Sequence, residues 1–143
     1  MGATKVAALF LAGVAARGDM MTSWDFHADK VDDPPAGFSF GKTGQDENNY
    51  YVARANALED NVRLYHVVRG KRSQFAGWNG KVAGQAWHAL AVEARGNRFQ
   101  VFFDGKAVID ARDDTFQDAG KVGVWTKADS VTWFSGLSLK PQQ

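Results

Sequence analysis

The segment from Trp87 to Val108 contains two turn signals that separate three runs of alternating apolar and polar residues. Its sequence is WHALAVEARGNRFQVFFDGKAV, and the dipeptides GN and DG interrupt the alternation. Gly, Asn and Asp tolerate the backbone angles of tight two-residue turns, and a period of two places the apolar side chains on one face of a strand. The segment therefore predicts three consecutive antiparallel strands that each turn one face toward a core.

The same period of two continues along most of the chain after Tyr50, and segments rich in Gly, Asn and Asp separate the runs. The predicted strands are Tyr50–Ala55, Asn61–Arg69, Ser73–Trp78, Trp87–Arg95, Arg98–Phe103, Lys106–Ala111, Gly120–Thr126 and Val131–Leu139. Trp24 and Phe26 alternate as an edge strand would. The pattern predicts an all-β fold, an antiparallel jelly-roll-like β-sandwich with helix confined to an N-terminal signal region.

The parity of these strands predicts which apolar side chains face the core, because residues two apart share a face. On the segment Arg98–Phe103, for example, Phe99 and Val101 share one face. The predicted core is Leu90, Val92, Phe99, Val101, Phe103, Val108, Val122, Val124 and Leu137.

The N-terminal sequence MGATKVAALFLAGVAARG has the pattern of a secretory signal peptide. Lys5 precedes an apolar run from Val6 to Val14, and small residues follow. The run is too short to cross a bilayer, which needs roughly 20 apolar residues. We expect a signal peptide over residues 1–18 with cleavage near Ala16, a β-sandwich domain over residues 19–143, and a secreted or periplasmic protein without a membrane span. A buried N-terminal helix, or translation from Met20 or Met21, is the alternative.

Composition excludes several classes of protein. The 143 residues are enough for one domain with a sizeable core. A formal net charge of +1 gives no basic surface for nucleic acid, so no nucleic-acid partner is predicted. The chain has no cysteine, which excludes disulfides, thiolate metal sites and cysteine nucleophiles.

The order W-H-x-L-x-V-x-x-x-G-x-x-F-x-V-x-x-D-G from Trp87, followed by AGKVGVWTKADSVTWFSGLSL, resembles the C-terminal half of concanavalin A-like jelly rolls. It is most similar to the bacterial secreted group that includes laminin-G-like and 3-keto-disaccharide hydrolase (DUF1080) domains, and the segment Asn48–Arg72 also matches. The resemblance covers Tyr50 to Leu139. It implies that the last strand returns beside the N-terminal WDF strand.

The chain departs from this family in its N-terminal half. Such domains usually have several more strands between a PPAGF segment, here Pro34–Phe38, and the strand that begins at Tyr50. A sheet that lacks strands has an exposed edge, through which the chain could form a homo-oligomer.

Catalytic residues are not predicted. The resemblance implies that a glycoside hydrolase of this fold would have carboxylates spaced as E-x-D-x-x-E or E-x-D-x-E, and the three glutamates, Glu47, Glu59 and Glu93, lack that spacing. The enzyme hypothesis is therefore weaker than a binding function, but a glycoside hydrolase or keto-disaccharide hydrolase remains an alternative.

Metal ligands and cofactors are not predicted either. His27, His66 and His88 are far apart and match no zinc motif. Several acids gather in the segment Asp25–Asp33, which could attract calcium but lacks the glycine turn and spacing of an EF-hand loop. A solvated loop is the favoured interpretation.

Polar residues on one face of the first hairpin form the candidate ligand-binding site. These residues are Arg54, Asn56, Arg63 and Tyr65. Aromatic rings stack on the C–H faces of sugars, and Arg and Asn donate hydrogen bonds to hydroxyl groups. The prediction is a non-catalytic carbohydrate-binding module. Two alternatives remain: nearby acids such as Glu47, Glu59 or Asp60 pair with the arginines, or the chain is a structural β-domain that pairs with another chain.

Overall fold

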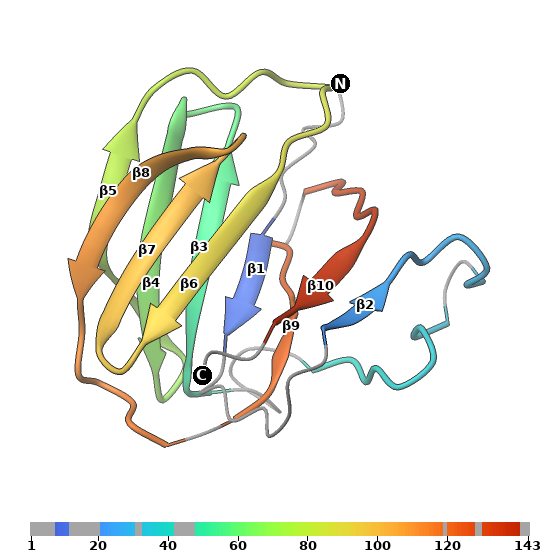
Figure 1. Ribbon diagram of the computed structural model, residues 1–143, viewed down its shortest axis with the longest axis horizontal. Helices are drawn as coiled ribbons and strands as arrows, with labels where there is room; N and C mark the ends of the chain where they lie inside the picture. Colours follow the sequence, from blue (N-terminus) through green and yellow to red (C-terminus); the bar gives the residue numbers. More distant parts are fainter. Residues whose placement is uncertain are drawn as a thin grey trace.

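The computed structural model consists of antiparallel strands and their connections (Figure 1). It describes residues 8–11, 21–30, 33–41, 48–118, 120–127 and 130–140. The strands are β1 (Ala8–Leu11), β2 (Thr22–Trp24), β3 (Tyr50–Asn56), β4 (Asn61–Val68), β5 (Lys71–Asn79), β6 (Leu90–Arg95), β7 (Arg98–Phe103), β8 (Lys106–Arg112), β9 (Val122–Val124) and β10 (Leu137–Leu139). No helix occurs in the described residues, so the predicted all-β fold is confirmed.

The strands form three sheets. The largest has the order β5-β4-β3-β1-β9, a second has the order β6-β7-β8, and β10 pairs with β2. Figure 1 shows β6, β7 and β8 across one face of β3, β4 and β5. These two facing sheets form the β-sandwich. The pairing of β10 with β2, in which Leu137 lies opposite Trp24, confirms that the last strand returns beside the WDF segment.

Two-residue turns close two of the hairpins, and the sequence predicts the one at Asp104 and Gly105. Asp104 and Gly105, between β7 and β8, have φ angles of 48° and 80°. Arg69 and Gly70, between β4 and β5, have φ angles of 51° and 76°. Positive φ at both central residues is the requirement of a type I′ turn, whose twist matches that of paired strands. These turns fix the register of each hairpin.

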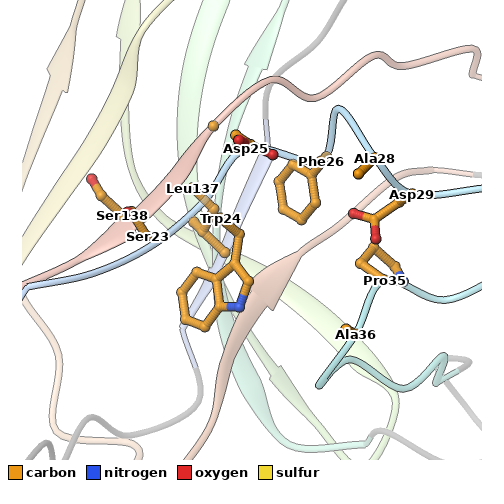
Figure 2. A pocket seen from close by; sticks show the side chains of 11 residues that line it. Ser23, Trp24, Asp25, Phe26, Ala28, Asp29, Pro35, Ala36, Leu137 and Ser138 are labelled. Carbon is orange, nitrogen blue, oxygen red and sulfur yellow. The ribbon is translucent and has the colours of Figure 1, made fainter.

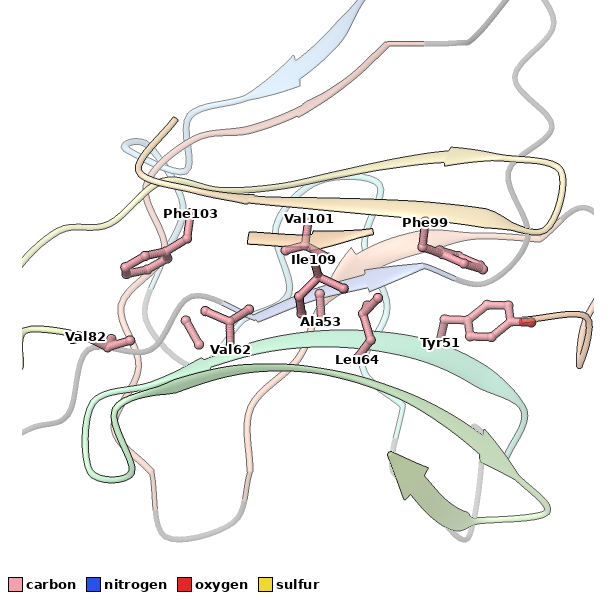
Figure 3. Packing of buried hydrophobic residues seen from close by; sticks show 10 residues of the cluster. Tyr51, Ala53, Val62, Leu64, Val82, Phe99, Val101, Phe103 and Ile109 are labelled. Atoms are coloured by element: carbon pink, nitrogen blue, oxygen red, sulfur yellow. The ribbon is translucent and has the colours of Figure 1, made fainter. Parts of the chain in front are cut away.

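The main core lies between the five-stranded and the three-stranded sheets. Figure 3 shows Phe99, Val101 and Phe103 of β7 pointing toward Val62 and Leu64 of β4. Val101 is fully buried and lies opposite Val92 and Ile109 in the two neighbouring strands. Full burial of a side chain such as Leu64 stabilises the fold by about 1.5–3 kcal/mol relative to exposure.

The predicted core is correct for β7 and for most of its neighbours. Leu90, Val92, Val108 and Val122 pack against it. Val124 does not, and is 37% exposed. It ends a three-residue strand at the edge of the large sheet, where the smaller sheet does not cover it. Leu137 is buried outside this core, in the pair β2–β10.

The helix expected in the signal region is not found at Ala8–Leu11. These residues form strand β1, which lies between β3 and β9 and pairs antiparallel with both. A short apolar run fits a strand as well as a helix, so its periodicity could not decide between them. The predicted cleavage site near Ala16 lies outside the described residues, and cleavage itself remains a prediction. Within the described residues, no helix is long and apolar enough to cross a membrane.

Candidate functional site

The face of β3, β4 and β5 that points away from the main core contains the predicted ligand-binding residues. Arg54 lies directly opposite Arg63, and Val52 lies opposite Tyr65. Residues two apart on a strand share a face, so the four predicted residues lie on the same side of the hairpin. We call this surface, defined by Arg54, Arg63, Tyr65, Arg72 and Trp125, the arginine face.

Arg54 is buried, with 7% of its surface exposed, and is held by protein groups. Its Nη2 donates a hydrogen bond of 2.8 Å to Oε2 of Glu59 and lies 3.5 Å from Oδ1 of Asn61. The hydrogen bond from Asn61 and the charge of Arg54 lower the pKa of Glu59. This pairing is the alternative that the sequence left open. The Nε of Arg54 is buried and has no hydrogen-bond partner among the described residues.

Asn56 has a turn role. Its Oδ1 accepts a hydrogen bond of 2.9 Å from the backbone N–H of Leu58, the i to i+2 contact that Asn commonly makes in turns. The side chain therefore shapes the β3–β4 connection at the end of the arginine face.

Arg63 lies across the neighbouring strand β5. Its Nη1 donates to the carbonyl oxygen of Trp78 at 2.8 Å, and its Nη2 donates to Oδ1 of Asn79 at 2.6 Å. Gly77 lies directly opposite, and a Cβ atom there would come within 2.7 Å of the Arg63 side chain. The absence of a side chain at Gly77 thus gives the guanidinium its path over β5.

Tyr65, Arg72 and Trp125 form a cation–π cluster. The guanidinium carbon of Arg72 lies 4.8 Å from the ring centroid of Tyr65 and 5.7 Å from that of Trp125. The guanidinium of Arg54 lies 5.5 Å from the same Tyr65 ring. Tyr65 is buried among Tyr50, Val52 and Val67, with Trp125 packed against them. The rings thus form an apolar base on which an exposed cation is stacked.

The site residues predicted from the sequence include neither Arg72 nor Trp125. Arg72 belongs to a segment that the sequence assigns to a turn, but β5 begins at Lys71. A bulge between β4 and β5 brings Gln74, rather than Phe75, opposite Tyr65. This shift places Arg72 on the arginine face, since it lies two residues from Gln74. No local pattern could reveal Trp125, which reaches this face from beyond β9.

Arg72 differs in its partners from the arginines that form ion pairs. Arg54 pairs with Glu59, and Arg98 pairs with Asp110. In the described part of the chain, no carboxylate lies within ion-pairing distance of Arg72. Its contact with two rings restricts the guanidinium, and because the side chain is exposed, N–H donors remain available at the surface. Such donors can bind the hydroxyl groups or carboxylates of a ligand.

Other polar clusters have structural partners. His88 contacts Asp104 at 2.7 Å and the carbonyl oxygen of Ala83 at 2.8 Å, which secures the start of β6. His66 contacts Asp113 at 3.0 Å. Among the described residues, no three His, Asp or Glu side chains are grouped to hold a metal ion.

Comparison with known proteins gives two matches. No protein-family model matches the chain. Over 92 residues, 63% of the chain, the sequence is 32% identical to levanase of Bacillus subtilis (strain 168), but this region is 13% of that protein. The structure is similar to a carbohydrate binding module, CBM66 from Bacillus subtilis, with a TM-score of 0.50 and 22% sequence identity. The match covers 97% of this chain and 68% of that chain.

The structural match establishes the fold: the chain is a β-sandwich of the kind seen in that carbohydrate-binding module. The chain spans about an eighth of the length of levanase, so the likeness to that enzyme concerns one part of it.

Proposed function

We propose that this chain is a carbohydrate-binding β-sandwich module with no catalytic activity of its own, and that its ligand contacts the arginine face. The likeness in fold to a carbohydrate-binding module and the partial match to a levanase support a carbohydrate ligand. Levan is therefore the first polysaccharide to test.

The observation that carries the proposal is that the exposed guanidinium of Arg72 lies against two aromatic rings. An exposed guanidinium usually loses side-chain entropy when it binds, but stacking on Tyr65 and Trp125 already restricts this one. The half-buried ring of Trp125 offers apolar surface for the C–H face of a sugar, and the guanidinium offers donors for its hydroxyl groups. A hydroxyl-rich glycan, or one with carboxylate groups, matches this combination.

The predicted site residues take different parts in this proposal. Tyr65 holds the guanidinium of Arg72 from below, and Arg63 adds donors further along the same face, opposite Gly77. Arg54 is buried and bonded to Glu59, and Asn56 holds the turn between β3 and β4. We assign these two the positioning of the face.

Three finer proposals accompany this function. The module belongs to the concanavalin A-like group with laminin-G-like and 3-keto-disaccharide hydrolase domains. The protein is secreted or periplasmic, with a signal peptide over residues 1–18. A homo-oligomer forms through an exposed sheet edge. Mass spectrometry of the N-terminus and sedimentation of the purified protein test the last two.

Affinity electrophoresis in gels that contain levan, inulin or polygalacturonate tests the binding function. We expect the parent chain to be retarded by at least one of them. Arg72→Ala should weaken that retardation roughly tenfold or more, which is about 1.4 kcal/mol, with little change in the melting temperature. Arg95→Ala is the matched control, because Arg95 is exposed on the three-stranded sheet and its loss changes the net charge equally.

Equal losses from Arg72→Ala and Arg95→Ala would assign the effect to net charge and contradict the proposed site. No retardation in any gel would contradict the binding function. Release of reducing sugar from levan or from keto-glycosides would support the enzyme alternative instead.

A further inference from the structure

A pocket of about 560 Å³ lies where β2 and the loop after it meet β10 (Figure 2). Its volume lies within the roughly 300–1,000 Å³ of small-molecule sites. None of its lining residues belongs to the arginine face. The pocket is therefore a separate feature of the fold.

Two aromatic rings form the apolar part of the pocket. Trp24 and Phe26 both line it, and Figure 2 shows them on the same segment, with Pro35 and Ala36 on the facing segment. Phe38 packs edge-on against both rings, with centroid distances of 5.4 Å to Trp24 and 5.7 Å to Phe26. These contacts fix the rings, so their surfaces are already in place before a ligand arrives.

The backbone of Phe26 is strained. Its φ angle is 61°, a left-handed conformation that is uncommon for a bulky residue and costs on the order of 1 kcal/mol or more. Such strained residues concentrate at ligand-binding sites. The next turn is stabilised by Asp25, whose Oδ1 accepts a hydrogen bond of 3.1 Å from the N–H of His27.

The polar part of the pocket consists of acceptors and hydroxyl groups. Asp25 and Asp29 supply carboxylates, and Ser23 and Ser138 supply hydroxyl groups. Among the described residues that line it, none is Lys, Arg or His. A carboxylate accepts hydrogen bonds from sugar hydroxyls, and a ring stacks on the sugar C–H face. Two carboxylates in the lining disfavour an anionic ligand.

We propose that this pocket is a second binding site, which takes one uncharged sugar ring. Trp24 and Phe26 contact its apolar face, and Asp25 and Asp29 accept hydrogen bonds from its hydroxyl groups. The inference does not depend on the arginine face, which presents donors of the opposite charge.

Titration of the ¹⁵N-labelled full chain with methyl β-D-fructofuranoside, methyl β-D-glucopyranoside and sodium glucuronate, followed by NMR, tests this site. We expect at least one of the uncharged glycosides to shift the amides of residues 23–29 and 136–138, and glucuronate to leave them unchanged. Asp29→Asn should weaken that binding roughly tenfold, and Ala36→Trp, which fills the pocket, should abolish it. Asp33→Asn is the matched control, because Asp33 is exposed in the same loop and does not line the pocket.

The proposal is overturned if neither glycoside shifts these amides, if glucuronate shifts them equally, or if Asp33→Asn weakens binding as much as Asp29→Asn. Tetramethylammonium is a further probe: shifts of the same amides that Asp29→Asn removes, without shifts by the glycosides, would make the pocket a cation site. Arg72→Ala separates the two proposals, because it should leave glycoside binding in the pocket unchanged while it reduces polysaccharide retardation.

Discussion

The hydroxyl group of Tyr51 in β3 donates a hydrogen bond of 2.7 Å to the carboxylate of Asp113, 62 residues further along the chain. The same carboxylate accepts a bond of 2.8 Å from the N–H of Thr115, and the Tyr51 oxygen accepts one of 3.0 Å from the N–H of Phe116. His66 of β4 contacts Asp113 from the other side. These bonds join the large sheet to the segment that follows β8 and close one end of the main core.

The ionisation of Asp113 should make stability sensitive to acid. Burial alone would raise the pKa of this carboxyl, but hydrogen bonds from Thr115, Tyr51 and His66 outweigh burial and hold its pKa at about 2, below the ordinary 3.8. Because the folded-state pKa is depressed, the contribution is complete above about pH 4 and is lost as the pH falls toward 2. We expect a loss of up to about 2 kcal/mol in the free energy of unfolding. Urea unfolding at several pH values measures it.

The variants Asp113→Asn and Tyr51→Phe separate the acid loss of stability from the alkaline loss. Asp113→Asn should reduce the acid loss, while other carboxylates still contribute the remainder. Burial and the bond to Asp113 raise the pKa of Tyr51 to about 12, so its contribution is complete below pH 10 and is lost between about pH 10 and 12. Tyr51→Phe should flatten that alkaline loss. If the free energy of unfolding of Asp113→Asn fell with decreasing pH as steeply as that of the parent, this account would be wrong.

Glu59 should stabilise the hairpin through Arg54. Arg54 is buried and Glu59 is the exposed partner, so Glu59→Ala leaves a buried guanidinium without its counter-charge. We expect a loss of about 1–3 kcal/mol, less than for a fully buried pair because solvent reaches the site of Glu59. Arg54→Met should cost less, since removal of the charge also removes the need to pair it. Thermal melting of both variants and of the double variant measures the coupling; additive effects would contradict it.

Burial at Val101 should make the three-stranded sheet intolerant of charge on its inner face. Val101→Asp places an unpaired carboxylate among Phe99, Phe103 and Ile109, and we expect a loss of several kcal/mol or failure to fold. Ala91→Asp in the neighbouring strand β6 is the control, because Ala91 is exposed. Melting followed by circular dichroism distinguishes the two variants. Equal losses of stability would mean that Val101 does not face the core.

Local patterns predicted the part of the fold between Tyr50 and Arg112 well. Alternation and turn residues such as Asp104 and Gly105 act over a few positions, so one sequence reveals them. The pairing of Arg54 with Glu59 was foreseen as an alternative for the same reason, since the two residues are five positions apart.

Features that depend on distant segments were not predicted. A bulge opposite Tyr65 reverses the parity of β5 and brings Arg72 onto the arginine face. Trp125, directly after β9, joins it only because the fold packs this residue against Tyr65 and its neighbours in β3 and β4. The pocket beside Trp24 needs β10, more than a hundred positions away, to complete its wall. Such arrangements are set by register and topology rather than by any local sequence signal.

Strand β1 should contribute to stability, because it lies inside the large sheet. Its four residues pair with β3, and three of them pair with β9. Removal of residues 1–18 would leave β3 with an unpaired edge, which favours aggregation. We expect the chain of residues 19–143 to melt at least about 5 °C below the full chain. In the full chain, Leu9→Pro should have a similar effect, because Leu9 lies opposite Ala53 and Val124 and proline cannot donate to the ladder. Leu9→Val, which retains the backbone N–H, is the control. A protein recovered from its host with an N-terminus near Arg17 and a melting temperature equal to that of the full chain would contradict this role and support the predicted signal peptide.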